Sequence, residues 1–363
     1  NEGIMQDGYT FSPLPEYISP APGQVKDYLD YIRSLPLNPN PNVFGLHDNA
    51  DISCARAETY STFATILSLQ PRVSAGGGMT REEKIETAAV EIKSRLPPMF
   101  DYEAASAKYP VTYKESMNTV LVQEIIRYNR LLSIMHSSLP DLLKALKGLV
   151  VMSESLDRMG ASLHDQTVPA NWQARAYPSL MPLAPWVDNL LRRCSFIQTW
   201  YEQGKPDCFW FSGFYFPQAF LTGALQNFAR KYTIAIDKVS FNFVVKDDLT
   251  PEAVTGPPED GVLIYGLQLE GARWDRETHS LEESLPKVLY SECPLLWLKP
   301  ESERLKPKTG IYNCPCYKTL TRHGTLSTTG HSTNYVLPVE LPCRREESHF
   351  IKRGVALFCA LDY

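Results

Sequence analysis

The sequence predicts an α+β fold, in which an N-terminal helical subdomain of antiparallel helices is followed by a C-terminal antiparallel β-barrel-like subdomain. Two observations support this prediction. Up to Tyr232 apolar residues recur every three or four positions, the period of an amphipathic helix, and beyond it they alternate with polar residues, the period of a strand. Residues 233–363 hold short strand-like segments without a helical stretch between them, so their sheet is expected to be antiparallel and curled towards a barrel.

The composition is that of an ordinary globular protein and argues against several classes of function. The chain has 363 residues, enough for a sizeable core in two or three units. Its formal net charge of −5 argues against nucleic acid as the main partner, because neutralising phosphates requires a basic excess. No apolar run approaches the ~20 residues that a membrane span needs, so no membrane partner is expected. The sequence begins at Asn1, with neither an initiating Met nor a signal segment. We therefore expect it to be part of a longer polypeptide.

Eight cysteines lie mostly in apolar context and are expected to be reduced, buried thiols of an intracellular protein. The one close pair, Cys314 and Cys316, has a single intervening residue where common zinc motifs have roughly two to four, so no metal is expected there. His47 beside Asp48 and Asp51 has the side chains of a metal site, but a turn or a helix cap explains this cluster better.

The helical part is expected to consist of helices that end at prolines, after a Pro-rich and aromatic connector at residues 1–22. Thr80 and Glu83 form the pattern of a capping box, and Ser138 with Pro140 predicts a break between two long helices. The predicted helices are residues 24–35, 54–69, 80–96, 114–136, 141–159 and 187–204.

Residues 209–232, FWFSGFYFPQAFLTGALQNFARKY, are unusually rich in aromatic side chains. Each of Trp210, Phe214, Phe216 and Phe220 would gain about 1.5–3 kcal/mol on burial. We therefore predict that this segment packs the helical part against the part that follows. The strands predicted after it are residues 239–245, 262–269, 288–298, 311–317, 335–341 and 355–361.

Residues 309–336, TGIYNCPCYKTLTRHGTLSTTGHSTNYV, are predicted to be two strands joined by a loop rich in Gly, Ser and Thr. The loop does not fit a phosphate-binding motif, because the spacing from Gly324 to Gly330 is one residue too long and His331 replaces the lysine. A structural hairpin whose hydroxyl groups bond to their own backbone is the preferred interpretation. Spacing alone does not support a nucleophilic pair of Cys316 and His331.

Four segments, spread over nearly the whole chain, resemble dynein heavy chains, the motor subunits that move along microtubules. The last three, which include Trp274, Gly324, Gly330 and His331, are more similar to the axonemal branch of the family than to the cytoplasmic one. In chain order the segments are NVFGLHDNADI at 42–52, FWFSGFYFPQAFLTGALQNFARKY at 209–232, LEGARWDRETHSL at 269–281 and CPCYKTLTRHGTLSTTGHSTNYV at 314–336.

The resemblance implies a domain organisation and a role. Residues 1–52 would end the small helical part of the sixth AAA+ module, residues 53–232 would form the helical half of the dynein C-terminal domain, and residues 233–363 its β-barrel half. The domain would be a cap that packs on the AAA+ ring of the same heavy chain and regulates a minus-end-directed motor. Its setting would be cytoplasmic and cytoskeletal, in the axoneme of a cilium or flagellum, with other dynein chains and microtubules reached through the parent motor.

No GxxxxGK[ST] motif occurs in the sequence, so this chain is expected to be non-catalytic and to hold no cofactor. By the resemblance, ATP and Mg²⁺ belong to modules encoded upstream. Two other classes stay open. A stand-alone intracellular enzyme would use the loop 324–332 and depend on His331 and Ser332, whereas a binder of microtubules or another acidic partner would use the basic pairs 344–345 and 352–353 and weaken with salt.

Overall fold

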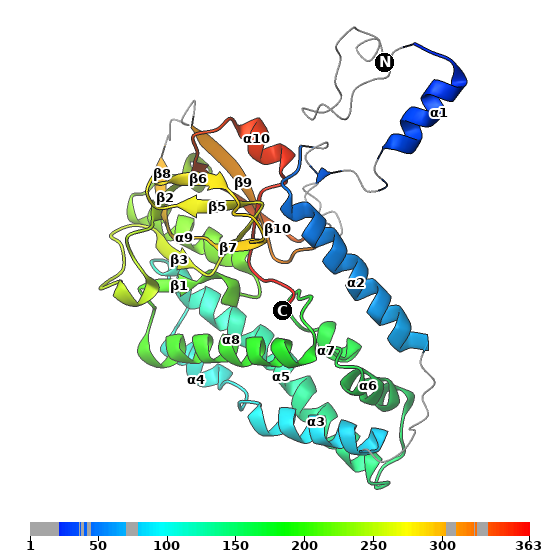
Figure 1. Cartoon of the computed structure of the whole chain (residues 1–363). Helices are drawn as coiled ribbons and strands as arrows, with labels where there is room; N and C mark the ends of the chain where they lie inside the picture. The colour runs from blue at the N-terminus through cyan, green and yellow to red at the C-terminus, as the bar shows by residue number, and fades with distance from the viewer. Residues whose placement is uncertain are drawn as a thin grey trace.

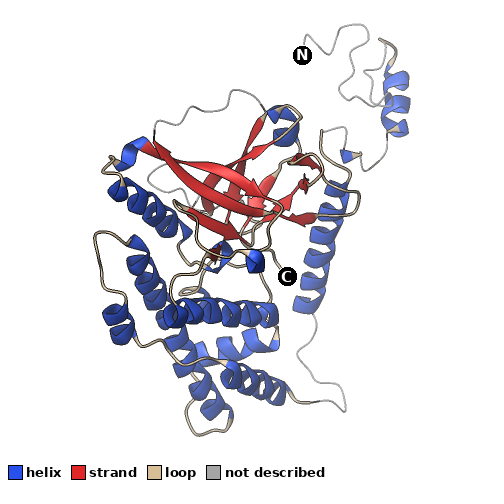
Figure 2. Ribbon diagram, turned by 90° about the vertical axis from the view of Figure 1, so that its left-hand side faces the viewer, coloured by secondary structure: helices blue, strands red, loops and turns tan. Residues whose placement is uncertain are grey.

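The computed structural model describes residues 22–35, 37, 40–41, 45–69, 79–302, 310–322, 324 and 333–363. Most helices gather at one end of the molecule and the strands at the other, as the colours of Figure 2 show. The mixed fold with its helical part first is therefore confirmed. The helices are α1 (Val25–Ser34), α2 (Asn49–Leu69), α3 (Arg81–Arg95), α4 (Tyr102–Lys108), α5 (Ser116–Leu146), α6 (Glu154–His164), α7 (Ala170–Gln173), α8 (Leu183–Gln203), α9 (Pro217–Lys231) and α10 (Glu347–Lys352).

Helix α5 is the centre of the helical half and contacts each of α3, α4, α6, α7, α8 and α9 (Figure 1). Its apolar stripe is fully buried at Leu121, Ile125 and Leu132. A helix that buries one face along its whole length can organise a bundle, because each shorter helix gains a partner for its own apolar face. The other helices are arranged around this one.

The predicted break near Pro140 is wrong, because α5 runs through it to Leu146. Proline in a helix interior removes a hydrogen bond and costs ~3 kcal/mol. Leu139 and Leu142 on either side of it are both fully buried, and burial of two leucines offsets such a cost. The helix ends instead just before Gly148, whose φ of 72° is the left-handed conformation that glycine favours.

The other predicted helix starts agree better with the structure. The capping box is confirmed: the amide of Glu83 donates to Oγ1 of Thr80 at 3.2 Å, and the amide of Thr80 donates to Oε2 of Glu83 at 2.8 Å. Helix α6 starts with Ser153 as its N-cap, which accepts from the amide of Leu156. The predicted helix at 24–35 is confirmed as α1, and the one at 54–69 begins earlier, at Asn49.

The strands form two larger sheets and one hairpin. One sheet has the order β1-β3-β8-β2, the other has the order β10-β9-β11-β4-β7, and β5 pairs with β6 alone. The strands are β1 (Cys208–Trp210), β2 (Val239–Lys246), β3 (Val262–Tyr265), β4 (Gln268–Glu270), β5 (Ala272–Asp275), β6 (Ser280–Glu283), β7 (Tyr290–Glu292), β8 (Leu295–Ser302), β9 (Ile311–Tyr317), β10 (Tyr335–Pro342) and β11 (Ala356–Phe358).

Two of the predicted strands are each split between the two larger sheets. Residues 262–269 give β3 in the first sheet and β4 in the second, and residues 288–298 give β7 in the second and β8 in the first. Strands that switch sheets form the corners of packed sheets, and such corners need a bend. The first bend is at Gly266, with a φ of 92°. A Cβ there would lie 2.5 Å from Cδ1 of Trp210, so only glycine fits.

The prediction of an antiparallel β-barrel-like subdomain is not supported. Among the described residues, the first sheet ends at β1 and β2 and the second at β10 and β7, and no hydrogen-bonded ladder joins these edges. Two pairings are parallel, β1 with β3 and β11 with β9. The sequence period identifies a strand but not its partner, and β1, β5 and β6 were not predicted because they are only three or four residues long.

We expect Gly266→Ala to lower the free energy of unfolding by about 2–4 kcal/mol, because alanine would combine an unfavourable positive φ with a clash against Trp210. Gly256→Ala is the matched control, since nothing lies within 4 Å of the position of its Cβ and its φ is not positive. Denaturant unfolding measures both variants. Equal stability of the two would contradict the close approach at the corner.

Candidate functional site at the junction of the two halves

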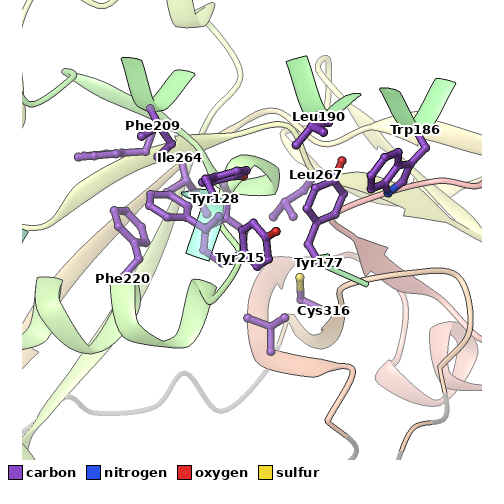
Figure 3. Close-up of a cluster of buried hydrophobic side chains, with 14 of the residues drawn as sticks. Tyr128, Tyr177, Trp186, Leu190, Phe209, Tyr215, Phe220, Ile264, Leu267 and Cys316 are labelled. Carbon is purple, nitrogen blue, oxygen red and sulfur yellow. The ribbon is translucent and has the colours of Figure 1, made fainter. Parts of the chain in front are cut away.

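Residues 208–217 belong to both halves of the molecule. They form β1, which pairs with β3 of the first sheet, then a short turn of 3₁₀ helix at Phe211–Gly213, and then the start of α9, which packs on α5. Figure 3 shows a cluster of buried side chains at this junction. They come from both halves: Tyr128 from α5, Leu190 from α8, Phe209 from β1, Phe220 from α9, Ile264 from β3 and Cys316 from β9. This segment is the candidate site because it joins the helices to the sheets.

Three of the four predicted packing residues of this segment are buried. Trp210, Phe214 and Phe220 are 5%, 4% and 0% exposed. The rings of Phe214 and Phe220 stack with centroids 4.5 Å apart, and the ring of Phe209 lies 4.8 Å from that of Phe220. Aromatic pairs at such distances contribute about 0.5–1.5 kcal/mol beyond their buried area.

Phe216 differs from these three because its side chain is 38% exposed. The guanidinium of Arg127 on α5 lies 5.1 Å from the centre of its ring, and Nζ of Lys318, just after β9, lies 5.8 Å from it. Phe216 is therefore placed between cations of the two halves, a cation–π arrangement.

A buried carboxylate that was not predicted holds the start of α9. Glu124 on α5 is 1% exposed and accepts hydrogen bonds from the amides of Tyr215 at 2.6 Å and Phe216 at 3.1 Å. Burial raises the pKa of Glu124 to about 7, although the two amides and the charges of Arg127 and Arg193 favour its ionised form. The signal in the sequence was an acidic residue within the apolar stripe of a predicted helix.

A buried arginine and two tyrosines hold the same stretch of backbone. Arg193 on α8 is 3% exposed, and its Nη1 donates to the carbonyl of Phe214 at 3.4 Å. The hydroxyl of Tyr128 donates to the carbonyl of Gly213 at 2.7 Å, and that of Tyr215 donates to the carbonyl of Arg175 at 3.1 Å. Side chains of α5 and α8 thus fix the backbone of residues 213–216, and with it the angle between the halves.

The remaining predicted site residues lie elsewhere or outside the described residues. Trp274 on β5 is 9% exposed, and its Nε1 donates to Oδ2 of Asp247 at 2.7 Å, which fixes the end of β2. Gly324 is exposed, and Gly330 and His331 lie outside the described residues. The structure does not bring Trp274 or Gly324 to the junction.

The cysteine and histidine sites that the sequence suggested have little support in the described residues. Cys314 and Cys316 are fully buried. Burial raises the pKa of Cys314 well above its ordinary value, and a hydrogen bond with Cys359 together with burial does the same for Cys316, so both thiols stay protonated. Nδ1 of His47 accepts from the amide of Asn49 at 3.0 Å, as a cap.

The part of the chain that the structure describes offers no candidate for a metal site or a membrane-spanning helix. It contains no group of three or more His, Cys, Asp or Glu side chains placed to hold a metal ion. Within the same residues no helix is both long and apolar enough to cross a lipid bilayer.

These features define a structural domain in which a helical bundle and two open sheets are joined by a buried junction. Residues 56–359 match the family model of the C-terminal domain of dynein heavy chains. The protein belongs to this family, as the four sequence segments predicted.

Relatives of known name are similar over nearly the whole chain. Dynein axonemal heavy chain 1 of Homo sapiens is 54% identical over 370 residues, which cover 99% of this chain and 9% of that protein. Dynein axonemal heavy chain 3 of Homo sapiens is 50% identical over 359 residues, and dynein axonemal heavy chain 12 of Homo sapiens is 47% identical over 356, covering 9% and 11% of those proteins. The chain thus spans about a tenth of the length of the relatives it matches.

We expect Glu124→Gln to change how stability depends on pH. Below an ordinary pKa of 4.5 the carboxyl is protonated in both the folded and unfolded states, whereas between pH 4.5 and about 7 only the unfolded state releases its proton. The wild-type chain should therefore lose stability relative to Glu124→Gln as pH rises through this window, by up to about 3 kcal/mol. Denaturant unfolding at several pH values measures the difference.

Glu115→Gln is the matched control, with the opposite sign. Burial opposes ionisation of Glu115, but hydrogen bonds from Lys205 and Asn227 outweigh it and lower the pKa of Glu115. The advantage of the wild-type chain over Glu115→Gln should thus be lost as pH falls through that lowered pKa. If the stability difference between Glu124→Gln and the wild-type chain did not vary with pH, Glu124 would not be the buried titrating group described above.

Proposed function

We propose that this chain is the C-terminal cap of an axonemal dynein heavy chain, which packs on the AAA+ ring of the same polypeptide and regulates the microtubule motor. In this proposal residues 1–52 end the sixth AAA+ module, and residues 53–232 and 233–363 are the two halves of the cap. The chain acts in the axoneme of a cilium or flagellum, and other dynein chains and microtubules are reached through the parent motor. Support comes from the family and from the relatives named above.

One observation carries the packing role. Helix α2 has no buried side chain from Asp51 to Ile66. Its Tyr60, Phe63 and Ile66 are 72%, 61% and 47% exposed. A helix in a folded protein owes most of its stability to the packing of an apolar face, so a 21-residue helix that exposes three large apolar side chains calls for a surface outside the described residues.

The start of α2 is held firmly to the strand-rich half. Nδ2 of Asn49 donates to the carbonyls of Leu285 and Val288, both at 2.9 Å, and its Oδ1 accepts from the amide of Lys287 at 2.7 Å. Asn49 is 8% exposed, so these bonds are shielded from water. Movement of whatever covers α2 would therefore reach the β half, and through the junction the helical half, which is what a cap that couples to a ring requires.

Helix α1, which precedes α2, also supports the proposal of a cap. Helix α1 carries Val25, Leu29 and Ile32 on one face, and they are 75%, 46% and 60% exposed. Residues spaced in this way form an apolar stripe. The exposed stripe of α1 supports the proposal that residues 1–52 pack within another module.

Catalysis is proposed to reside elsewhere in the heavy chain, with ATP and Mg²⁺ bound in modules encoded before Asn1. The alternative of a stand-alone enzyme has no support from a described contact, because the Cys316 thiol is buried and the Gly330 and His331 part of the loop lies outside the described residues. One member of each basic pair is also engaged. Arg345 lies 3.5 Å from Glu283, and Nη1 of Arg353 donates to the carbonyl of Gly45 at 3.2 Å.

The first test is ATP turnover by the purified 363-residue chain. We expect no turnover above that of buffer, because the sequence contains no motif that would bind the phosphates. The full heavy chain assayed in parallel serves as the positive control. Turnover by the isolated chain that disappeared in His331→Ala would overturn the proposal and favour the enzyme.

The second test replaces the exposed face of α2 with Tyr60→Ser, Phe63→Ser and Ile66→Ser together. In the isolated chain the free energy of unfolding should change by less than about 1 kcal/mol, since these side chains are exposed there. In the full heavy chain, amide exchange along α2 should become faster and the microtubule gliding velocity should change. Ser61→Ala, on the other side of the same helix, is the control. Wild-type exchange and gliding in the triple variant would contradict packing through α2.

A further inference from the structure

A cleft of about 770 Å³ lies on the helical half, beside the junction and apart from α2. The middle of α5 forms its floor, the loop before α4 forms one wall, and the end of α7 brings Arg175 to the other. Asn129 ties the wall to the floor, because its side chain exchanges two hydrogen bonds of 2.8 Å with the backbone of Phe100. The lining residues are Met99, Tyr102, Ile126, Asn129, Arg130, Ser133, Ile134 and Arg175.

The charged side chains that line the cleft are all positive. Arg130 and Arg175 line the cleft, and no acidic residue does. Within the described residues neither guanidinium forms an ion pair, whereas Arg95, Arg158 and Arg345 all do. Asp101, next to the wall, is occupied in capping α4 through the amide of Ala104. Two guanidinium groups without a counter-charge favour a carboxylate ligand, which each can bind through paired N–H groups.

The positive charge continues along α5 towards the β half. Arg127 lies three residues before Arg130, so the two are neighbours on the helix surface. Its guanidinium lies over Phe216, and so does Nζ of Lys318. The carboxylate that faces Arg127 and Lys318 is that of Glu124, which is buried and bonded to backbone amides. A ligand that extends from the cleft along α5 would therefore meet further cations beyond Arg130 and Arg175.

The cleft also offers apolar contacts, which distinguish a peptide from a small anion. Met99 is 53% exposed and Tyr102 is 46% exposed. The volume is several times that of a single phosphate or carboxylate group, and apolar anchors with a few placed charges are typical of peptide-binding surfaces.

We propose that this cleft binds an acidic segment of a separate polypeptide, with two carboxylates placed against Arg130 and Arg175 and an apolar side chain against Met99 and Tyr102. A separate polypeptide is favoured because none of the described side chains between residues 22 and 66, which in the proposed function lead to the sixth AAA+ module, lines the cleft. They meet the strand-rich half instead, through Asn49 and through an ion pair of 2.7 Å between Arg56 and Asp362.

The experiment is a selection of a displayed library of random 12-residue peptides on the full 363-residue chain. Sequences with two acidic residues beside an apolar one should be enriched. A selected peptide, synthesised with a fluorescent label, should bind roughly tenfold more weakly to Arg130→Gln and to Arg175→Gln, and its affinity should fall as salt is raised. The charge reversal Arg130→Glu with Arg175→Glu should abolish binding of this peptide and accept its counterpart in which lysines replace the acidic residues.

Arg276→Glu is the matched control, since Arg276 is an exposed arginine in the turn between β5 and β6. It should leave the affinity unchanged. Circular dichroism and thermal melting check that each variant is folded, which we expect because the replaced side chains are exposed. The proposal is overturned if the enriched sequences lack acidic residues, if Arg276→Glu weakens binding as much as Arg130→Gln does, or if polyglutamate competes as well as the selected peptide.

Discussion

The contact on which the structure most depends is between the carboxylate of Glu124 and the amides of Tyr215 and Phe216. It connects the longest described helix to a segment that is strand, turn and helix start within ten residues. The amides at the start of a helix lack partners within that helix and carry partial positive charge, so an anion is suited to this place. Burial opposes the charge, and the balance of the two effects leaves the pKa of Glu124 near 7. The two hydrogen bonds thus hold the start of α9 against α5.

Around this contact the molecule is organised by close backbone approach. Trp210 packs against the bend at Gly266, where β3 leaves the first sheet and the chain enters β4 of the second. A second glycine, Gly261, lies so close to β8 that a Cβ would meet the carbonyl oxygen of Leu298 at 2.0 Å. The aromatic segment that joins the two halves therefore also fixes where the two sheets divide. Open sheets with such corners keep edges, and one of the described edges, β10, carries Pro338 and Pro342, which cannot donate to an added strand.

The described surface has an apolar region and a separate, positively charged cleft, and both fit the proposed cap. One region, α1 and α2, exposes apolar side chains at the N-terminal end, and another, the arginine-lined cleft on α5, exposes unpaired positive charge. Apolar faces suit a permanent contact, because they release water on burial whatever the salt concentration, whereas a charged cleft suits a reversible and salt-dependent one. A domain built in this way can hold one neighbour firmly and exchange another. The chemistry of its interior, protonated thiols and carboxylates engaged with backbone, serves packing.

By itself the sequence determined that a helical part precedes a strand-rich part, the capping box at Thr80, the aromatic segment and the family, since these depend on local period, local hydrogen bonds and long ordered matches. It could not determine which strands pair, because a period of two is the same in every sheet, and it placed a break at Pro140 where burial of Leu139 and Leu142 prevails. Glu124 and Arg193 become a site only when α5 and α8 meet the backbone of residues 213–216. Tertiary structure decided these points because contacts between distant residues set the energy of burying a charge or bending a strand.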